Sequence, residues 1–235
     1  MKLGIMQPYF FPYLGYFDLI NYVDKWIVFD TVQYIRHGWI NRNRILHPQE
    51  GWLYIVVPVK PSRDSYIRNV TVDNGHDWKQ RIIGQLGHYK RKAPYFHETV
   101  ALVRECLDPE ETSISRLNTN ALSKVCERLG IGFDYRVLSE MDIELGPVEG
   151  PGDWALRISE ALGAEEYVNP PGGVDIFDEA MFAASNIKLT FRRLPPLEYT
   201  CRGYEFIPNL SIIDLLMWNK PEFIKGYLDE HRYDT

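Results

Sequence analysis

The chain has 235 residues, of which 45% are hydrophobic and 25% are charged, and its formal net charge is -6. This composition predicts a folded globular protein and excludes a disordered one. The negative charge argues against non-specific binding to nucleic acid or to a membrane surface, because both depend on basic patches. The sequence has neither an apolar stretch long enough to span a membrane nor a secretory signal. We therefore expect a cytoplasmic protein without membrane insertion.

Three cysteines, Cys106, Cys126 and Cys201, are widely spaced and odd in number, and they form no CxxC pair. This pattern favours buried core thiols over a disulfide framework or a zinc site. We expect no metal site, and the sequence does not indicate which cofactor, if any, is bound.

The first thirty residues predict a parallel βαβ unit. Residues 2–6 form a short apolar run, residues 14–25 carry apolar side chains at helical spacing, and residues 26–30 form a second apolar run. Ligands of such sheets bind beyond the carboxyl ends of the strands. These ends are Gln7 and Asp30, so the candidate site is placed between residues 7 and 34.

The remaining pattern predicts one α/β domain over residues 1–235, with a Rossmann-like parallel (mixed) sheet and helices on both faces. A small antiparallel hairpin insertion is expected at about 39–72, and a helical segment at about 77–129. Strands are expected at 39–46, 52–59, 67–72, 133–138, 166–168 and 187–191, and helices at 78–91, 94–106, 113–129, 154–162, 175–184 and 212–218. Residues 147–152, rich in proline and glycine, have the composition of a linker.

The loop after the first strand is the densest polar and aromatic cluster. A loop that enters a helix presents backbone N–H groups to a phosphate or carboxylate. No GxGxxG or Walker motif is present. We favour ligand-binding roles for Gln7 and Tyr9, and core positions for Phe10, Phe11 and Tyr16.

A second cluster spans residues 30–44. His37 is the best candidate for acid/base catalysis, because its unperturbed pKa lies near neutrality, and Asp30 is its candidate catalytic partner. Gln33 and Tyr34 lie on the same strand-end loop and are expected to bind substrate.

Arginines and asparagines alternate at the end of this cluster. Arg42 and Arg44 share one strand face, and Asn41 and Asn43 share the other. Paired guanidinium groups suit a phosphate or carboxylate, although a solvated strand face would show the same pattern.

A third cluster follows the strand at 166–168. Asn169 and Asp175 are candidate binding residues there, and Gly172 and Gly173 would let a ligand approach the backbone. A plain turn would use the same residue types.

Four segments, GIMQPYFFPYLGYFDLI, VQYIRHGWINRNRI, KAPYF and EFIPNLSIIDLL, resemble the WbqC-like family in order along the chain. The resemblance implies a bacterial protein of a polysaccharide or O-antigen gene cluster, and a role in transferring glycine or a comparable acyl group to an amino sugar. The third loop departs from the family's pattern, with Pro170-Pro171 where family members carry glycine and serine. The first strand, loop and helix are also similar in layout to nucleotidylyltransferase-like proteins, but their HxGH signature is absent, since no histidine precedes His37.

Three functions remain open at this stage. The first is an enzyme that transfers an acyl or aminoacyl group to the amine of a nucleotide-linked amino sugar. The second is an ATP-dependent or nucleotidyl-transfer enzyme, and the third is a non-catalytic sugar-nucleotide binding protein. In each case the partner is a nucleotide-linked sugar or another small phosphorylated molecule, and a homodimer is compatible with the sequence.

Overall fold

A five-stranded parallel sheet forms the centre of the protein. The computed structural model describes residues 1–61, 65–108 and 110–232. The strands lie in the order β7-β2-β1-β8-β9, and every neighbouring pair is parallel. Their bounds are β1 Lys2–Met6, β2 Lys25–Val28, β7 Tyr135–Val137, β8 Glu166–Asn169 and β9 Lys188–Phe191. The parallel sheet predicted from the first βαβ unit is confirmed.

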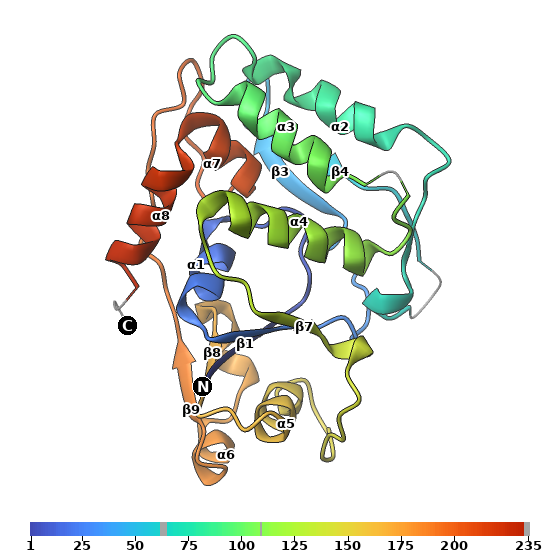
Figure 1. Ribbon diagram of the computed structural model, residues 1–235, viewed down its shortest axis with the longest axis vertical. Helices are drawn as coiled ribbons and strands as arrows, with labels where there is room; N and C mark the ends of the chain where they lie inside the picture. Colours follow the sequence, from blue (N-terminus) through green and yellow to red (C-terminus); the bar gives the residue numbers. More distant parts are fainter. Residues whose placement is uncertain (62–64, 109, 233–235) are drawn as a thin grey trace.

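Helices cover both faces of this sheet (Figure 1). One face packs against α1 (Leu14–Tyr22) and α4 (Ile114–Leu129), and the other packs against α5 (Asp153–Ala161) and α6 (Glu179–Ala184). The period of two along the strands explains this division. Leu3 and Ile5 of β1 point toward α5, whereas Gly4 points toward α1, where an added Cβ would lie 2.7 Å from the Trp26 ring.

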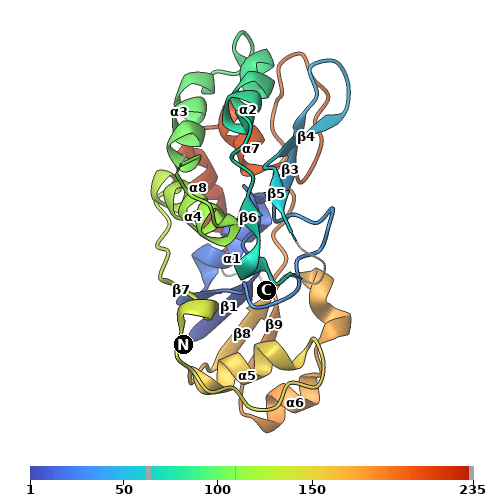
Figure 2. The ribbon, with the colours of Figure 1, turned by 90° about the vertical axis from the view of Figure 1, so that its right-hand side faces the viewer.

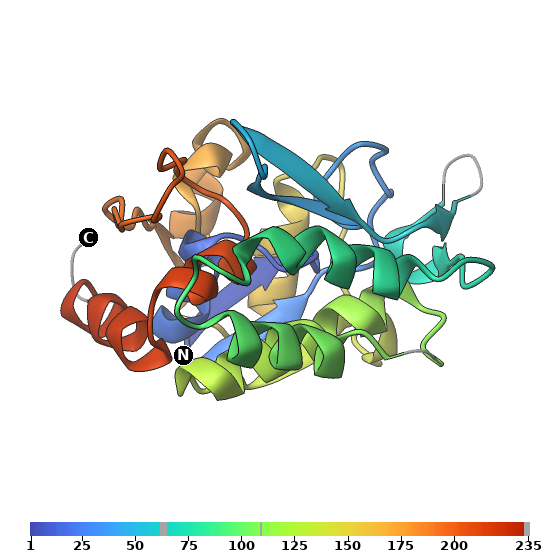
Figure 3. The ribbon, with the colours of Figure 1, turned by 90° about the horizontal axis from the view of Figure 1, so that it is seen from above.

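The helical segment and the antiparallel insertion form a second layer beside the sheet (Figures 2 and 3). Helices α2, α3 and α4 pack side by side, and α7 packs against α3 and β3. The other bounds are β3 Arg42–Leu46, β4 Trp52–Val56, β5 Val59–Lys60, β6 Thr71–Val72, α2 Trp78–Leu86, α3 Phe96–Cys106, α7 Ile212–Trp218 and α8 Pro221–Glu230. The pairs β3–β4 and β5–β6 are antiparallel, as predicted, although residues 62–64 of the expected insertion lie outside the described residues.

The capping signals in the sequence account for several helix ends. The Asp77 side chain accepts a hydrogen bond from Gln80 N at the start of α2, and Ser113 accepts one from Arg116 N at the start of α4. Helix α4 ends at Gly130, which has a φ of 69° and is therefore in the left-handed region that glycine favours.

Three expectations about secondary structure were wrong in part. The expected strand at 67–72 begins as the short 3-10 helix η1 (Ile67–Asn69), and only Thr71–Val72 pair as a strand. The expected helix at 175–184 begins as the 3-10 helix η4 (Pro171–Ile176) and becomes α-helical only at Glu179. Helix α8 was not predicted, because it buries only Ile224 and Leu228 and its apolar pattern is short. Two further 3-10 turns are η2 (Gly87–Tyr89) and η3 (Leu138–Glu140).

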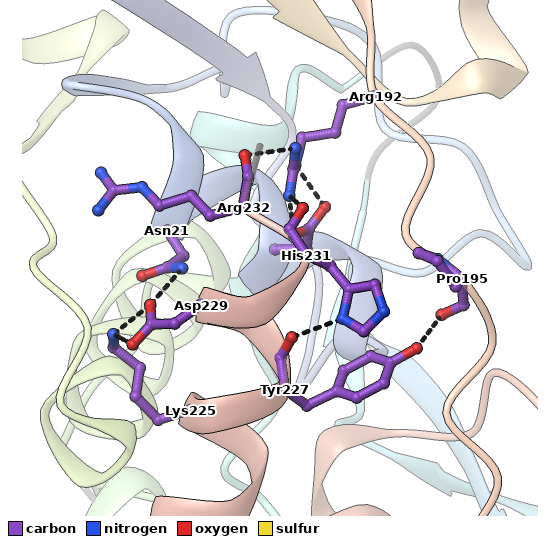
Figure 4. Close-up of polar contacts among 9 residues, drawn as sticks. Asn21, Arg192, Pro195, Lys225, Tyr227, Asp229, His231 and Arg232 are labelled. Atoms are coloured by element: carbon purple, nitrogen blue, oxygen red, sulfur yellow. Dashed lines mark hydrogen bonds and ion pairs between the residues drawn. The ribbon is translucent and has the colours of Figure 1, made fainter. Parts of the chain in front are cut away.

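A buried ion pair joins α1 to the end of the chain. Arg192, directly after β9, donates from Nε and Nη2 to the two carboxylate oxygens of Asp18, both at 2.7 Å. Both side chains are buried. The same guanidinium donates to the carbonyls of His231 and Arg232 (Figure 4). The helix that follows the first loop is thereby fixed to β9 and to the end of α8.

Among the described residues, no helix combines the length and the apolar character needed to cross a membrane.

Candidate functional site

The central pocket is a cavity of about 670 Å³ at the carboxyl edge of the parallel sheet. Its floor contains Met6 at the end of β1, Gln7 directly after it, Phe29 after β2 and Asn169 at the end of β8. The chain runs outward from β1 to β2 on one side of the sheet and returns to β8 on the other. The pocket therefore lies where the strand order reverses, which is the usual ligand position in open α/β sheets.

The walls of the central pocket are amide and aromatic side chains. Gln7, Gln33 and Asn169 contribute amides, and Tyr9 contributes a phenol. The aromatic walls come from Phe29, Tyr167, Trp154 and Phe177. Among the described residues, Glu149 is the one carboxylate in the lining, and no lysine, arginine or histidine contributes to it. This chemistry suits hydroxyl groups, the apolar faces of a ring and a positively charged or amine group.

Buried asparagines hold the first loop in place. Asn118 on α4 donates to the carbonyls of Pro8 and Ile40 at 2.8 and 2.7 Å, and Asn43 donates to the carbonyls of Phe10 and Phe11 at 3.0 and 2.9 Å. Phe11 has a φ of 40°, so its backbone is strained, and these bonds help to maintain it. These hydrogen bonds from Asn118 and Asn43 therefore fix the backbone of the loop that carries Gln7 and Tyr9.

Gln7 and Tyr9 both line the pocket, and their surroundings define how each can act there. The backbone carbonyl of Gln7 accepts a hydrogen bond from Tyr16 Oη at 2.7 Å, and Gln7 is one of the residues that line the pocket. Burial raises the pKa of the Tyr9 phenol, and the neighbouring Tyr13 raises it further. Tyr9 therefore acts as a neutral hydroxyl near neutral pH. Phe10, Phe11 and Tyr16 are buried in the core, as expected.

Asn169 is also fixed before any ligand arrives. Its Oδ1 accepts from Tyr167 Oη at 2.8 Å, and its Nδ2 donates to the Pro170 carbonyl at 2.9 Å. A Cβ at Gly173 would lie 2.1 Å from Asn169 Nδ2, whereas one at Gly172 would meet nothing within 4 Å. Glycine is therefore needed at position 173 so that the Asn169 side chain can occupy this position. The space left by the missing side chain of Gly173 is filled by Asn169 and is not available for a ligand to approach the protein backbone.

The segment expected to be a linker, residues 147–152, forms one wall of the pocket. Asp153 Oδ2 accepts hydrogen bonds from the backbone N–H groups of Glu149 and Gly150, at 2.8 and 2.9 Å. These bonds lower the pKa of Asp153. A Cβ at Gly152 would lie 2.3 Å from the Ile176 carbonyl, so glycine lets this segment meet η4 across the pocket. Glu149 is exposed at the rim and is held there by its backbone.

Several predicted site residues lie outside the lining of this pocket. Asp30 is buried, and its carboxylate accepts from Ser115 Oγ at 3.1 Å, Ser139 N at 3.1 Å and Ser139 Oγ at 2.7 Å. Its carboxylate therefore joins β2 to α4 and η3, a structural contact. His37 is exposed on a turn with a φ of 65°, and its carbonyl accepts from Arg42 Nη2.

The other predicted binding residues also have protein partners. Tyr34 Oη donates to Asn41 Oδ1 at 2.9 Å, and Asn41 Nδ2 donates to the Val57 carbonyl at 2.9 Å. The Arg42 guanidinium lies 4.1 Å from the centre of the Tyr54 ring. Asp175 is exposed on η4, outside the lining, although the next residue along the chain, Ile176, is part of it. The structure brings Gln7, Tyr9, Gln33 and Asn169 together in one pocket and places Arg44 in a neighbouring one.

Sequence reasoning missed Glu149, Phe29, Trp154 and Phe177. Phe29 directly precedes Asp30 and follows β2, so the strand-end rule could have found it. Glu149 lies within a proline- and glycine-rich stretch that carries no signal for a binding wall. In the described part of the chain, no group of three or more histidine, cysteine or acidic residues is placed to hold a metal ion.

The model of the WbqC-like protein family matches residues 7–225. The chain belongs to this family. The match confirms the resemblance carried by the four sequence segments, and every residue of the WbqC-like chain discussed as part of the central pocket, except Met6, lies within it.

This WbqC-like chain is also 33% identical over 223 residues to the uncharacterized protein Rv1507c of Mycobacterium tuberculosis, a match that covers 92% of each chain. No solved structure matches the chain. The family relationship therefore extends over nearly the whole WbqC-like fold. The chemistry of the pocket follows from the residues that line it.

Proposed function

We propose that this protein is a cytoplasmic enzyme of bacterial surface-polysaccharide biosynthesis that transfers an acyl or aminoacyl (glycyl-like) group to the amine of a nucleotide-linked amino sugar. The lining of the central pocket carries the proposal. Amides from three different strand-end loops, together with aromatic rings, suit the hydroxyls and the carbon faces of a sugar ring. The carboxylate of Glu149 suits its amine.

The reaction that fits this lining is direct transfer without a covalent enzyme intermediate. The amine nitrogen attacks the carbonyl carbon of an activated donor, such as a thioester, and the new C–N bond forms. The bond from that carbon to the thioester sulfur breaks, and the sulfur leaves with the electron pair. Glu149 takes the proton that the nitrogen loses, and the proton finally reaches the thiol product.

The three cysteines favour direct transfer over a thioester on the enzyme. All three thiols are buried, and burial raises the pKa of both Cys106 and Cys201 to about 12. A thiol with so high a pKa contains little thiolate, which is the nucleophilic form. Positioning and proton transfer are thus the contributions that the chain can make.

The nucleotidyl-transfer alternative has less support from the same lining. A triphosphate bound within the central pocket itself would lie beside Glu149, the one carboxylate in the lining, and no basic side chain of the described residues lines that pocket to offset its charge. The non-catalytic alternative keeps one specific observation in its favour, because the Glu149 side chain is exposed and the hydrogen bond that anchors this residue comes from its backbone N–H.

A paired measurement tests the proposal. The protein is incubated with a nucleotide-linked amino sugar and a panel of acyl thioesters that includes a glycyl thioester, and the amide product is detected by mass spectrometry. The same sugar nucleotide with a hydroxyl in place of the amine serves as the substrate control. We expect amide formation with the amino sugar, and a rate at least about 100-fold lower for Glu149→Gln, since general base catalysis typically contributes that much.

The matched control variant is Glu144→Gln, which replaces an exposed glutamate that precedes this segment and does not line the pocket. It should keep the wild-type rate. Full turnover by Glu149→Gln would remove the proton-transfer role. Thermal stabilisation by the amino sugar without any amide product, for every donor, would favour the binding protein, and stabilisation by ATP with Mg²⁺ alone would favour nucleotidyl transfer.

A further inference from the structure

A second, smaller cavity of about 260 Å³ shares Tyr9 with the central pocket. We call it the Arg44 pocket, and its lining is Tyr9, Tyr13, Trp39, Asn43, Arg44 and Asn209. Its charge is opposite to that of the central pocket, since among the described residues its lining contains the cation of Arg44 and no carboxylate. Its volume is below the 300 Å³ or so at which pockets begin to enclose a whole small molecule, so it suits one part of a larger ligand.

The Arg44 guanidinium is incompletely satisfied by the protein. Its one hydrogen bond among the described residues is from Nη2 to the Asn209 carbonyl, at a long 3.4 Å. Its Nε is buried from solvent without a hydrogen-bond partner, and among the described residues it forms no ion pair. A buried donor without a partner is costly, so Arg44 keeps hydrogen-bonding capacity that the described residues do not use.

Arg42 lies on the same strand face as Arg44, but the two guanidinium groups have different hydrogen-bond partners. Arg42 donates to the carbonyls of His37 and Gly38, so its fork is directed into its own turn. The Arg44 guanidinium lies 5.3 Å from the Trp39 ring centre and 5.2 Å from the Trp52 ring centre. Flanking rings hold a guanidinium in one orientation while leaving its edge open for a phosphate.

The rest of the Arg44 pocket is preorganised. Asn43 is fixed by its bonds to the first loop, and Arg44 N donates to Asn43 Oδ1 at 2.8 Å. A Cβ at Gly15 would lie 2.5 Å from the Tyr13 ring, so glycine there lets this ring lie against the start of α1. Asn209 has a φ of 56°, a left-handed backbone that aims its carbonyl at Arg44.

We propose that the Arg44 pocket binds the diphosphate of a nucleoside diphosphate, with the base stacked on Trp39, which is 37% exposed. This inference rests on the proposed function and specifies how the substrate of that site is divided. The amino sugar occupies the central pocket with its amides and Glu149, and the phosphates lie beyond Tyr9 against Arg44. Two pockets of opposite charge preference suit a ligand with a cation at one end and an anion toward the other.

Binding without any acyl donor tests the inference. Calorimetric titrations of the full chain use ADP, UDP and dTDP, with inorganic phosphate and uridine as partial ligands. We expect at least one diphosphate to bind more tightly than either partial ligand. Arg44→Gln should weaken that binding about 10- to 100-fold, the usual effect of losing a charged hydrogen-bond donor, and Arg44→Lys should weaken it less.

Arg68→Gln is the matched control. Arg68 also lies over a tyrosine ring, Tyr66, at 5.6 Å, and it lines a different cavity that shares Trp154 with the central pocket. It should bind within about threefold of wild type. Trp39→Ala should weaken nucleoside diphosphate more than inorganic phosphate, because it removes the stacking surface for the base as well as one of the rings that flank Arg44. Raising the salt concentration should weaken the wild type more than Arg44→Gln, because the lost interaction is ionic.

Unchanged diphosphate binding by a folded Arg44→Gln, loss of binding in Arg68→Gln instead, or no binding of any diphosphate by the wild type would each overturn the inference. These outcomes are separable from failure of the proposed function. Transfer is measured as amide product from an amino sugar, and diphosphate binding is measured with neither sugar nor donor present.

Discussion

The ion pair between Asp18 and Arg192 offers the most demanding test of how α1 is held under the first loop. Burial raises the pKa of Asp18, and the hydrogen bonds and charge of Arg192 oppose that rise. Replacing either partner alone leaves a buried charge without compensation. We expect Asp18→Leu and Arg192→Met each to lower the free energy of unfolding by about 3–5 kcal/mol. For a chain of this length, that corresponds to a fall in Tm of about 6–20 °C.

The double variant should be less destabilised than the sum of the two single variants by about 2 kcal/mol or more, because the second replacement removes the stranded charge. The assay is urea denaturation followed by tryptophan fluorescence, at several pH values. In Arg192→Met the Asp18 carboxyl loses its cation, so its pKa in the folded state rises further above that of the unfolded chain. The folded state then binds the proton more tightly. The contribution of Asp18 to the stability of this variant is therefore greatest below the unfolded pKa of about 4 and is lost as the pH rises through the folded pKa.

Additive losses in the double variant would refute this reasoning, and so would a loss below about 1 kcal/mol for Arg192→Met. Exposed pairs are worth that little, so either result would mean that the pair is hydrated in solution. The surface pair Lys225–Asp229 on α8 is the matched control (Figure 4), and Lys225→Gln should cost less than about 1 kcal/mol.

Three further predictions follow from buried groups. Gly173→Ala should displace Asn169 and weaken amino-sugar binding several-fold in thermal-shift titrations, whereas Gly172→Ala should have no effect; equal effects would contradict the seating role. Burial raises the pKa of Asp214. The contribution of Asp214 to stability should therefore fall as the pH rises from the unfolded pKa of about 4 toward the folded pKa. In urea denaturation, Asp214→Asn should reduce this pH dependence. The buried cysteines should react with a thiol reagent at pH 8 only after unfolding; fast reaction of the native protein would disprove their burial.

Local sequence patterns were enough to place the helix and strands near the site. Alternating and continuous apolar runs located β1, α1 and β2, because burial on a pleated or helical face imposes those periods locally. The parallel arrangement followed from the βαβ rhythm, and with it the rule that a ligand lies at the strand ends. Gln7 and Tyr9 could be named on that basis, and the two arginines could be placed on one face by the two-residue period.

Which loops come together depends on the packing of the whole fold. The sheet order sets β8 beside β1, so Asn169 joins Gln7, and the loop before α5 closes over both with Glu149. No local pattern encodes such a pairing, because it depends on how distant segments bury their apolar faces together. The directions of the two arginine side chains could not be read from the sequence either. Arg42 and Arg44 occupy equivalent positions in the sequence pattern. The Arg42 guanidinium donates to the carbonyls of His37 and Gly38, whereas Nε of Arg44 has no acceptor among the described residues.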